Sequence, residues 1–421
     1  MNSPVWYRRL GPGLITACVL IGPGSIMTSS TVGAKYGFSM LWIVVLSSIL
    51  MMVFMTLGAR LGAVIEVTPA QVIRRMAGRG LAVFVGLAVF SIAALFQSGN
   101  NIGVASALEG FIHSKLAVAA LMVLLNALAI SFMFVFKDTY RMLERLMATF
   151  VGVMLGCFAV NLIRLHPNIS ELLGGFMPSL DGVDLQQEML PLLGMVGTTF
   201  VVTAAYYQAY LVQQKGWGID DIRHGMVDVR VSAIIILVIT LMLISTAATA
   251  FHGMALQDPS FQLASPLAVA DGLQKTFGDG ARIIFCLGLF SAAYSSYLIN
   301  SMIGGYMAAD GLGWDVKQES VVAKCLATLV LLVGMVIGLA VVVYNFDRTP
   351  TIIVAQALTV VASPLVAGGL LWVARSPQVM GTYVSSWWLR SIALLGFLVL
   401  VAMALKTAFY DLPAALAPIK N

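Results

Sequence analysis

The sequence has few charged residues for its length. Asp, Glu, Lys and Arg make up 10% of its 421 residues, whereas 60% are hydrophobic and the mean hydropathy is +0.94. A soluble domain carries about 25% charged residues, so this composition excludes a globular protein dissolved in water. Its apolar runs reach the ~18 residues that mark a membrane-spanning helix, and they lack the alternation of barrel strands. The chain is therefore predicted to be an all-α membrane protein.

Cysteine is also scarce. The four cysteines show no CxxC spacing, and each falls within or beside an apolar run, where a free thiol packs as a small hydrophobic side chain. The sequence thus predicts no disulfide, no metal site and no cofactor. It also lacks the nucleophile elbow and the phosphate-binding loop that would indicate an enzyme.

About eleven apolar segments are long enough to cross the membrane. They are predicted near 10–34, 38–60, 81–111, 115–136, 143–163, 189–213, 229–252, 280–307, 319–344, 350–373 and 386–408. With the N-terminus in the cytoplasm, 16 of the 24 basic residues fall on the cytoplasmic side and 8 outside. This bias follows the positive-inside rule. We expect a single transporter domain over residues 1–421 in a cell membrane such as a bacterial inner membrane, with an outer C-terminus and no nucleic-acid partner.

Two of these segments contain residues that interrupt helices. The first carries Gly22-Pro23-Gly24-Ser25 at its middle, where proline removes an amide donor and glycine weakens the helix. The sixth carries Gly197 and Thr199, whose hydroxyl can bond freed carbonyls. Interrupted helices in two halves mark the substrate site of inverted-repeat transporters. A simple proline kink is the alternative interpretation of the first segment.

Several short motifs are shared with a known family. They are Leu10-Gly11-Pro12-Gly13 in the first span, Ala59-Arg60-Leu61-Gly62 in the second, Ala292-Ala293-Tyr294-Ser295-Ser296 in the eighth, and Gln356 eight residues before Pro364 in the tenth. On these motifs the chain resembles, over nearly its whole length, the NRAMP (natural resistance-associated macrophage protein) family of proton-coupled carriers of divalent transition metals.

The resemblance implies a LeuT-like fold. Such a fold has two inverted five-helix repeats, here approximately 10–163 and 189–373, and this family adds one further helix, here approximately 386–408. It also implies that the substrate is held between the interrupted first and sixth spans.

The family's metal ligands are replaced in this chain. The family's first-span motif is Asp-Pro-Gly-Asn, whose aspartate and asparagine ligate the metal, and these positions are Gly22 and Ser25 here. Laying the family's sixth-span motif on this chain without gaps puts Val201 at the methionine whose sulfur selects soft metals.

The residues that the resemblance assigns to proton movement are replaced as well. Thr203 falls at the family's histidine and Gln208 at a second histidine position. The acidic pair of the family's proton route falls on Gln97 and Asn100. The usual route for proton coupling is therefore expected to be absent.

The predicted pocket is neutral and polar. Its substrate-binding residues are Gly22, Pro23, Gly24, Ser25, Thr199, Val201, Thr203, Tyr207, Gln208 and Gln356, with Gln97, Asn100 and Tyr294 as a possible polar pathway. A bare divalent cation needs anionic or several strong oxygen ligands to replace its water. Helix N-termini, in contrast, suit a carboxylate. We therefore predict alternating-access transport of a small organic solute, for example one bearing a carboxylate, with H⁺ or Na⁺ as a possible coupling ion.

Two alternatives stay open. The chain would keep the family's role as a carrier of Mg²⁺ or Mn²⁺ if backbone carbonyls and Gln356 held a hydrated cation through water. A receptor or scaffold that transports nothing is the other alternative. For Gln97 and Asn100 the structural alternative is a role as interhelical hydrogen-bond partners, and Asp228 with Arg230 is read as a solvated pair rather than an inner gate. Nothing in the sequence specifies the number of subunits.

Overall fold

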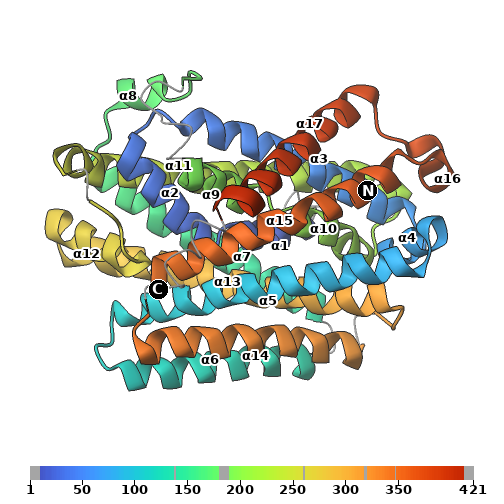
Figure 1. Cartoon of the computed structure of the whole chain (residues 1–421), viewed down its shortest axis with the longest axis horizontal. Coiled ribbons are helices and arrows are strands. Elements are labelled where there is room, and N and C mark those ends of the chain that lie inside the picture. The colour runs from blue at the N-terminus through green and yellow to red at the C-terminus, as the bar shows by residue number, and fades with distance from the viewer. Residues whose placement is uncertain are drawn as a thin grey trace, which may run out of the picture.

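The computed structural model describes residues 10–136, 139–179, 189–258, 261–316, 320–346 and 348–411, and every regular element within them is helical (Figure 1). The helices of the N-terminal part are α1 (Pro12–Leu20), α2 (Pro23–Tyr36), α3 (Leu41–Val64), α4 (Pro69–Ala77), α5 (Arg79–Glu109), α6 (Lys115–Val135), α7 (Thr139–Leu165) and α8 (Ile169–Gly174). Those of the C-terminal part are α9 (Met189–Thr199), α10 (Val202–Lys215), α11 (Ile222–Gln257), α12 (Pro266–Phe277), α13 (Asp279–Leu312), α14 (Val321–Tyr344), α15 (Arg348–Arg375), α16 (Pro377–Met380) and α17 (Trp387–Lys406).

Most of the predicted spans correspond to single helices. Within the described residues, eight helices are long and apolar enough to cross a membrane: α3, α5, α6, α7, α11, α13, α14 and α17. Two bent pairs raise the number to ten, namely α1 with α2, which meet at 56°, and the end of α15 with α16, which meet at 60°. The predicted all-α membrane fold is confirmed, whereas the number of eleven spans stays a prediction.

The short helices gather at the two ends of the molecule. In Figure 1, α4 and α16 lie at one end and α8 and α12 at the other. The segment 253–279, between the predicted spans 229–252 and 280–307, contains the helix α12 (Pro266–Phe277). Ser265 caps that helix by accepting a hydrogen bond from the amide of Ala268, and Pro266 occupies its first turn. Both are ordinary start signals of a helix.

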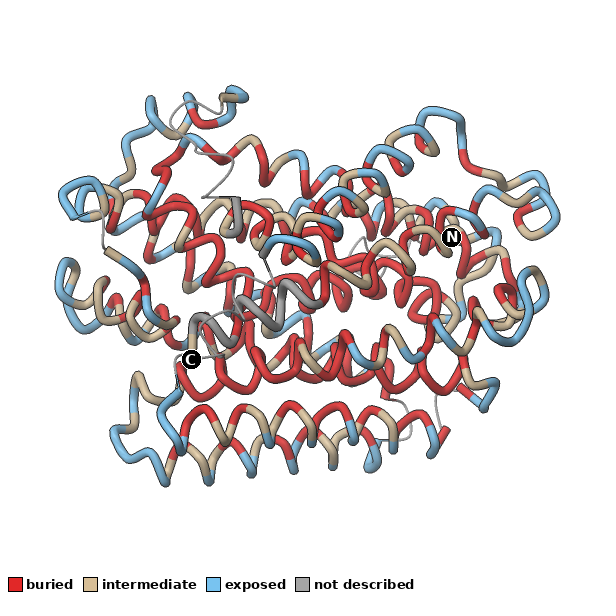
Figure 2. The backbone as a smooth tube through the Cα atoms, viewed as in Figure 1, coloured by how far each residue is buried: buried red, intermediate tan, exposed pale blue. Residues whose placement is uncertain are grey.

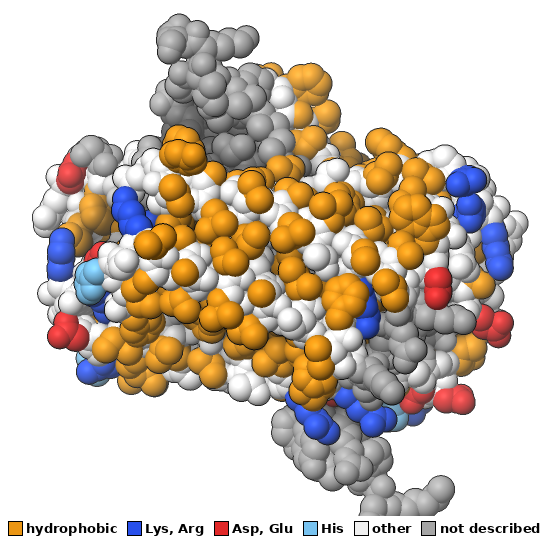
Figure 3. Space-filling model, turned by 90° about the horizontal axis from the view of Figure 1, so that it is seen from below, with side chains coloured by type: hydrophobic (Ala, Val, Ile, Leu, Met, Phe, Trp, Pro, Cys, Tyr) orange, Lys and Arg blue, Asp and Glu red, His pale blue; other side chains and the backbone are white. Residues whose placement is uncertain are grey.

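A broad apolar face runs between charged ends. Figure 3 shows this face, with hydrophobic side chains across its middle and charged side chains toward both ends. The helices α6 and α14 lie along it in Figure 1. They expose Leu116, Val123, Leu124, Leu128, Val135, Val321, Leu329, Leu332, Val336 and Val343. Such a surface suits the hydrocarbon of a bilayer, so the protein is an integral membrane protein whose α6–α14 pair faces lipid.

Buried residues gather around the centre of the molecule, as the tube in Figure 2 shows. Close helix contacts there depend on small residues. Gly58 and Gly62, one turn apart on α3, face the backbone carbonyls of Ala205 and Ala209 on α10, and a Cβ atom at either glycine would overlap with those carbonyls. Small side chains let backbones approach in this way inside membranes. The second half of the sixth predicted span is thereby packed tightly against the second span.

A buried carboxylate holds the N-terminus of α1. Asp228 on α11 accepts hydrogen bonds from the amides of Gly11 and Gly13 over 2.9 and 2.6 Å. The first amides of a helix have no partner within the helix, and their partial positive charge attracts an anion. The prediction of a solvated pair is wrong, because Asp228 is 0% exposed while Arg230 lies on the surface.

Replacing Asp228 should destabilise the fold. Asp228→Ala leaves the amides of Gly11 and Gly13 buried without acceptors, which costs about 1–3 kcal/mol for each amide. We expect a lower midpoint of thermal unfolding in detergent. Asp220→Ala, at an exposed position just before α11, serves as the control and should melt like the wild type. Equal melting of the two variants would contradict this role.

Candidate functional site

The first interrupted helix breaks at Ile21 and Gly22. α1 ends at Leu20 and α2 begins at Pro23. The hydroxyl of Ser25 accepts from the amide of Gly22 over 3.1 Å and donates to its carbonyl over 3.0 Å. Ser25 therefore caps α2. The predicted motif is confirmed as the place of the break, with Pro23, Gly24 and Ser25 forming the first turn of α2 rather than an unwound stretch.

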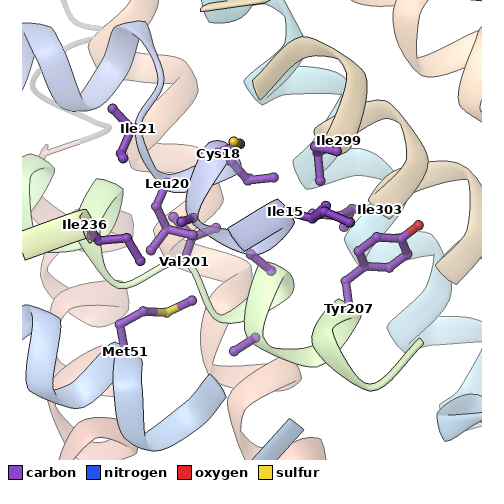
Figure 4. Close-up of a cluster of buried hydrophobic side chains, with 14 of the residues drawn as sticks. Ile15, Cys18, Leu20, Ile21, Met51, Val201, Tyr207, Ile236, Ile299 and Ile303 are labelled. Carbon is purple, nitrogen blue, oxygen red and sulfur yellow. The ribbon is translucent and has the colours of Figure 1, made fainter. Parts of the chain in front are cut away.

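The second interruption lies between α9 and α10. Phe200 and Val201 separate the two helices, and the Phe200 ring packs edge-on against Phe54 at 5.0 Å between centroids. The half-helices on either side of the two breaks are in contact, α1 with α10 and α2 with α9, and Figure 4 draws Leu20 and Val201 in the same group of buried side chains.

Threonines surround the second break. Thr198 on α9 shares a hydrogen bond of 3.1 Å with Thr28 on α2. The neighbouring hydroxyl of Thr199 is buried and has no hydrogen-bond partner among the described residues. Thr203 is buried on the first turn of α10. The helix after the first break, α2, and the helix before the second break, α9, are therefore tied together, and the hydroxyl of Thr199 is left without a partner among the described residues.

Hydrogen-bonded amide side chains from α5 and α13 lie beside the first break. Asn100 donates to the Oε1 atom of Gln97 over 3.3 Å, and Asn300 on α13 donates to the same atom over 2.9 Å. Gln97 in turn donates to the carbonyl of Tyr297 over 3.2 Å. Gln97 and Asn100 are at most 1% exposed. Gln97 and Asn100 therefore belong to one buried, neutral network between α5 and α13.

Three predicted residues lie away from the breaks. Gln208 contacts the hydroxyl of Thr16 and so joins α10 to the first half-helix, α1. Tyr207 belongs to the apolar cluster with Ile15 and Ile303 in Figure 4. Tyr294 donates to the carbonyl of Leu125 on α6 over 3.2 Å, on the far side of α13.

One predicted residue lies outside the described side chains. Gln356 belongs to α15, whose helical backbone is described there, but its side chain is outside what the structure describes. Its role in the site stays a prediction.

Ser296 is a site residue that sequence reasoning missed. Its hydroxyl donates to the carbonyl of Val19 at the end of α1 over 3.3 Å. A Cβ atom added at Gly22 would lie 3.1 Å from this hydroxyl oxygen. The available signal was the spacing of Ser296 and Asn300, two polar residues one turn apart in an apolar span, which places both on one helix face.

The oxygen atoms at the break are neutral. Amides and hydroxyls supply them, and the described part of the chain holds no group of three or more His, Cys, Asp or Glu side chains able to bind a metal ion. The site therefore presents dipoles rather than fixed negative charge to whatever enters it.

Two interrupted helices that meet at the centre of a helical bundle define a membrane transporter of LeuT-like fold. The fold of MhsT in complex with L-phenylalanine agrees, with a TM-score of 0.58 at 16% identity over 94% of this chain and 98% of that chain. A manganese transporter from Eremococcus coleocola superposes more closely, with a TM-score of 0.80 at 19% identity over 97% of this chain and 88% of that chain. The predicted fold class is thereby confirmed.

The sequence places the chain within this class. A family model described as natural resistance-associated macrophage protein-like (Nramp) matches residues 13–409, so the chain belongs to the Nramp family. The divalent metal cation transporter MntH of Bradyrhizobium diazoefficiens is 25% identical over 422 residues, covering 96% of this chain and 90% of the relative. MntH of Staphylococcus aureus strain Mu3 is 22% identical over 404 residues, covering 93% and 88%.

These relatives overturn the prediction of an organic solute as cargo. They are named for divalent metal cations, and the structural relative from Eremococcus coleocola is a manganese transporter. The missing carboxylates were expected to exclude a bare divalent cation, and the relatives instead favour the alternative of a divalent cation, which a hard ion permits because it accepts neutral oxygen ligands and retained water.

Adding a methyl group between α5 and α2 should disturb the first break. Gly103 on α5 packs against the ring of Pro23, and a Cβ atom there would overlap with that rigid ring. Gly103→Ala should therefore destabilise the protein by about 1–3 kcal/mol, measured as a lower unfolding midpoint in detergent. The matched control is Gly152→Ala on α7, where the added atom meets open space. If Gly152→Ala lost stability and Gly103→Ala did not, the close packing of Gly103 against Pro23 would be contradicted.

Proposed function

We propose that the protein is a secondary transporter that moves a hard divalent metal cation, Mg²⁺ or Mn²⁺, across a cell membrane by alternating access. The single observation that carries this proposal is membership of the Nramp family over residues 13–409. The named cargo of the MntH relatives and the meeting of two helix breaks at the centre of the bundle support it.

The neutral site favours a hard cation that keeps part of its water. Mg²⁺ gives up its hydration shell reluctantly and binds through few protein oxygens with several waters retained. Soft metals prefer sulfur or imidazole, and Val201 stands where the family has its methionine. Amide and hydroxyl oxygens at Asn100, Ser296 and Thr199 suit contacts with a hydrated ion.

The membrane potential supplies a driving force without a proton. A divalent cation carries two charges, and each charge gains about 2.3 kcal/mol per 100 mV. The two positions that correspond to the family's acidic pair hold the neutral amides Gln97 and Asn100. We therefore favour uptake driven by the potential over coupling to H⁺ at this site.

Polar contacts at both ends suit alternating access. At one end, Lys215 on α10 binds Glu144 on α7 over 2.7 Å and donates to the carbonyl of Leu10 over 3.2 Å. At the other end, Arg348 at the start of α15 pairs with Glu109 at the end of α5, with Nη2 and Oε1 2.7 Å apart. Opening either side would separate one of these pairs while the other stays closed.

Transport should be measured in liposomes. We expect the purified protein to take up Mn²⁺ or Mg²⁺ faster than empty liposomes, and faster when the interior is negative. The double substitution Gly22→Asp, Val201→Met should tighten Mn²⁺ uptake by about tenfold or more, because it adds an anion and a sulfur ligand. Gly22→Asn with Val201→Met is the matched neutral control. Absence of divalent cation uptake alongside uptake of an organic acid would overturn the proposal.

The orientation has its own test. We propose that the N-terminus is cytoplasmic, because 16 of the 24 basic residues then lie inside. In intact cells, an impermeant maleimide should label Thr276→Cys, in the last turn of α12, and should spare Asp220→Cys, between α10 and α11. Both positions are exposed, and the wild type with its four cysteines gives the background. Labelling of Asp220→Cys alone would reverse the orientation.

A further inference from the structure

The side-chain oxygen of Asn100 is buried without a donor. Asn100 is 1% exposed, and its Oδ1 atom has no hydrogen-bond partner within the described residues. Buried acceptors in native proteins are nearly always paired, and leaving one unpaired is costly. An unpaired oxygen at the centre of a membrane protein therefore needs an explanation.

The network of α5 and α13 fixes the direction of this oxygen. The Nδ2 atom of Asn100 donates to Gln97, whose Oε1 atom is also held by Asn300. Gln97 cannot turn around, because its own Nε2 atom donates to the carbonyl of Tyr297. A flip of Asn100 would place its oxygen against the oxygen of Gln97. The amide group is thus locked with its nitrogen toward the network and its oxygen away from it.

The locked oxygen faces the first helix break. A Cβ atom added at Gly22 would lie 3.4 Å from Oδ1 of Asn100 and 3.1 Å from Oγ of Ser296. Ser296 donates its proton to the carbonyl of Val19, so the lone pairs of its oxygen remain available. Two oxygens, one from α5 and one from α13, therefore converge on the position where the resemblance places the family's metal-binding aspartate.

We propose that Asn100 and Ser296 are cargo ligands, which form a neutral oxygen subsite for a hard, partly hydrated divalent cation beside Gly22. Both atoms are free only as acceptors, which suits a metal ion or the protons of its bound water. The amide dipole of Asn100 takes the place of the lost carboxylate from the opposite side of the break. This inference rests on the proposed transport of a divalent cation and assigns the ligands of that site to α5 and α13.

Asn126 offers a matched control. It is also a buried asparagine with an unpaired oxygen, but its nitrogen donates to Asn101 and to the carbonyl of Met122, on the α6 side of α5. It has the same chemistry and burial as Asn100, but no contact with the break is recorded for it. If removing any buried amide weakens transport, substitutions at both positions should change KM and Kd. If Asn100 is a ligand, only its substitution should change them.

The test is uptake of Mg²⁺ and Mn²⁺ into liposomes over a range of concentrations, with binding of MgCl₂ and MnCl₂ measured by calorimetry. Asn100→Ala should raise KM and Kd by about tenfold or more, whereas Asn126→Ala should stay within about twofold of the wild type. Asn100→Asp should bind Mn²⁺ more tightly than the wild type, because it places a full charge at the same oxygen. Ser296→Ala should weaken binding in the same direction as Asn100→Ala.

The outcomes separate the two proposals. If the wild type carries Mg²⁺ or Mn²⁺ and Asn100→Ala does so with unchanged KM and Kd, the subsite is refuted while the transport function stands. If the wild type neither binds nor carries a divalent cation, both fall together. A variant that loses uptake through misfolding is recognised by its unfolding midpoint. In that case Asn100→Asp decides: a ligand position should gain more Mn²⁺ affinity from the charge than the matched variant Asn126→Asp, in which the charge attracts the ion only from a distance.

Discussion

The structure depends on one constraint: a helix interrupted inside a membrane exposes backbone groups that water cannot reach. Each exposed group therefore has to find a partner within the protein. At the first break Ser25 bonds both the amide and the carbonyl of Gly22. At the far end of α1, Asp228 accepts from the amides of Gly11 and Gly13. Side chains thus satisfy the start of each half-helix, Asp228 at α1 and Ser25 at α2. These side chains come from α11 and α2, so the packing of these helices around α1 also fixes the position of the site.

The same constraint explains why the site is formed without charge. Ionisable groups inside a membrane are costly unless they are paired or bound to an ion. Among the described residues, the buried carboxylates are Asp228 and Asp310, and both are bonded by backbone amides or hydroxyls away from the break. Neutral amide groups such as Gln97 and Asn100 have a smaller desolvation penalty than a carboxylate when the site holds no cargo. A neutral site of this kind binds a cation more weakly, but it is less unfavourable when it is empty.

Much of the fold could be predicted from the sequence, because long apolar runs and a Gly-Pro-Gly motif are local signals. The helices α6 and α9 begin at the predicted residues, and α5 begins two residues before the predicted start. Other features depend on contacts between distant segments. Asp228 looked like a surface residue, since nothing in its neighbourhood reveals the amides 215 residues away that it binds. Ser296 and Asn300 were overlooked for the same reason. The cargo was mispredicted because residue types alone do not show which neutral oxygens remain unpaired.

The glycine contacts between α3 and α10 have a mechanical consequence. With Gly58 and Gly62 seated against the carbonyls of Ala205 and Ala209, these two helices form one stiff unit. Gln208 adds α1 to that unit through Thr16. Any swing of α9 relative to this block must be absorbed by the backbone torsions of Phe200 and Val201, the two residues that join α9 to α10. In the proposed alternating-access cycle, the amplitude of motion is then set by a two-residue joint rather than by the bending of whole helices.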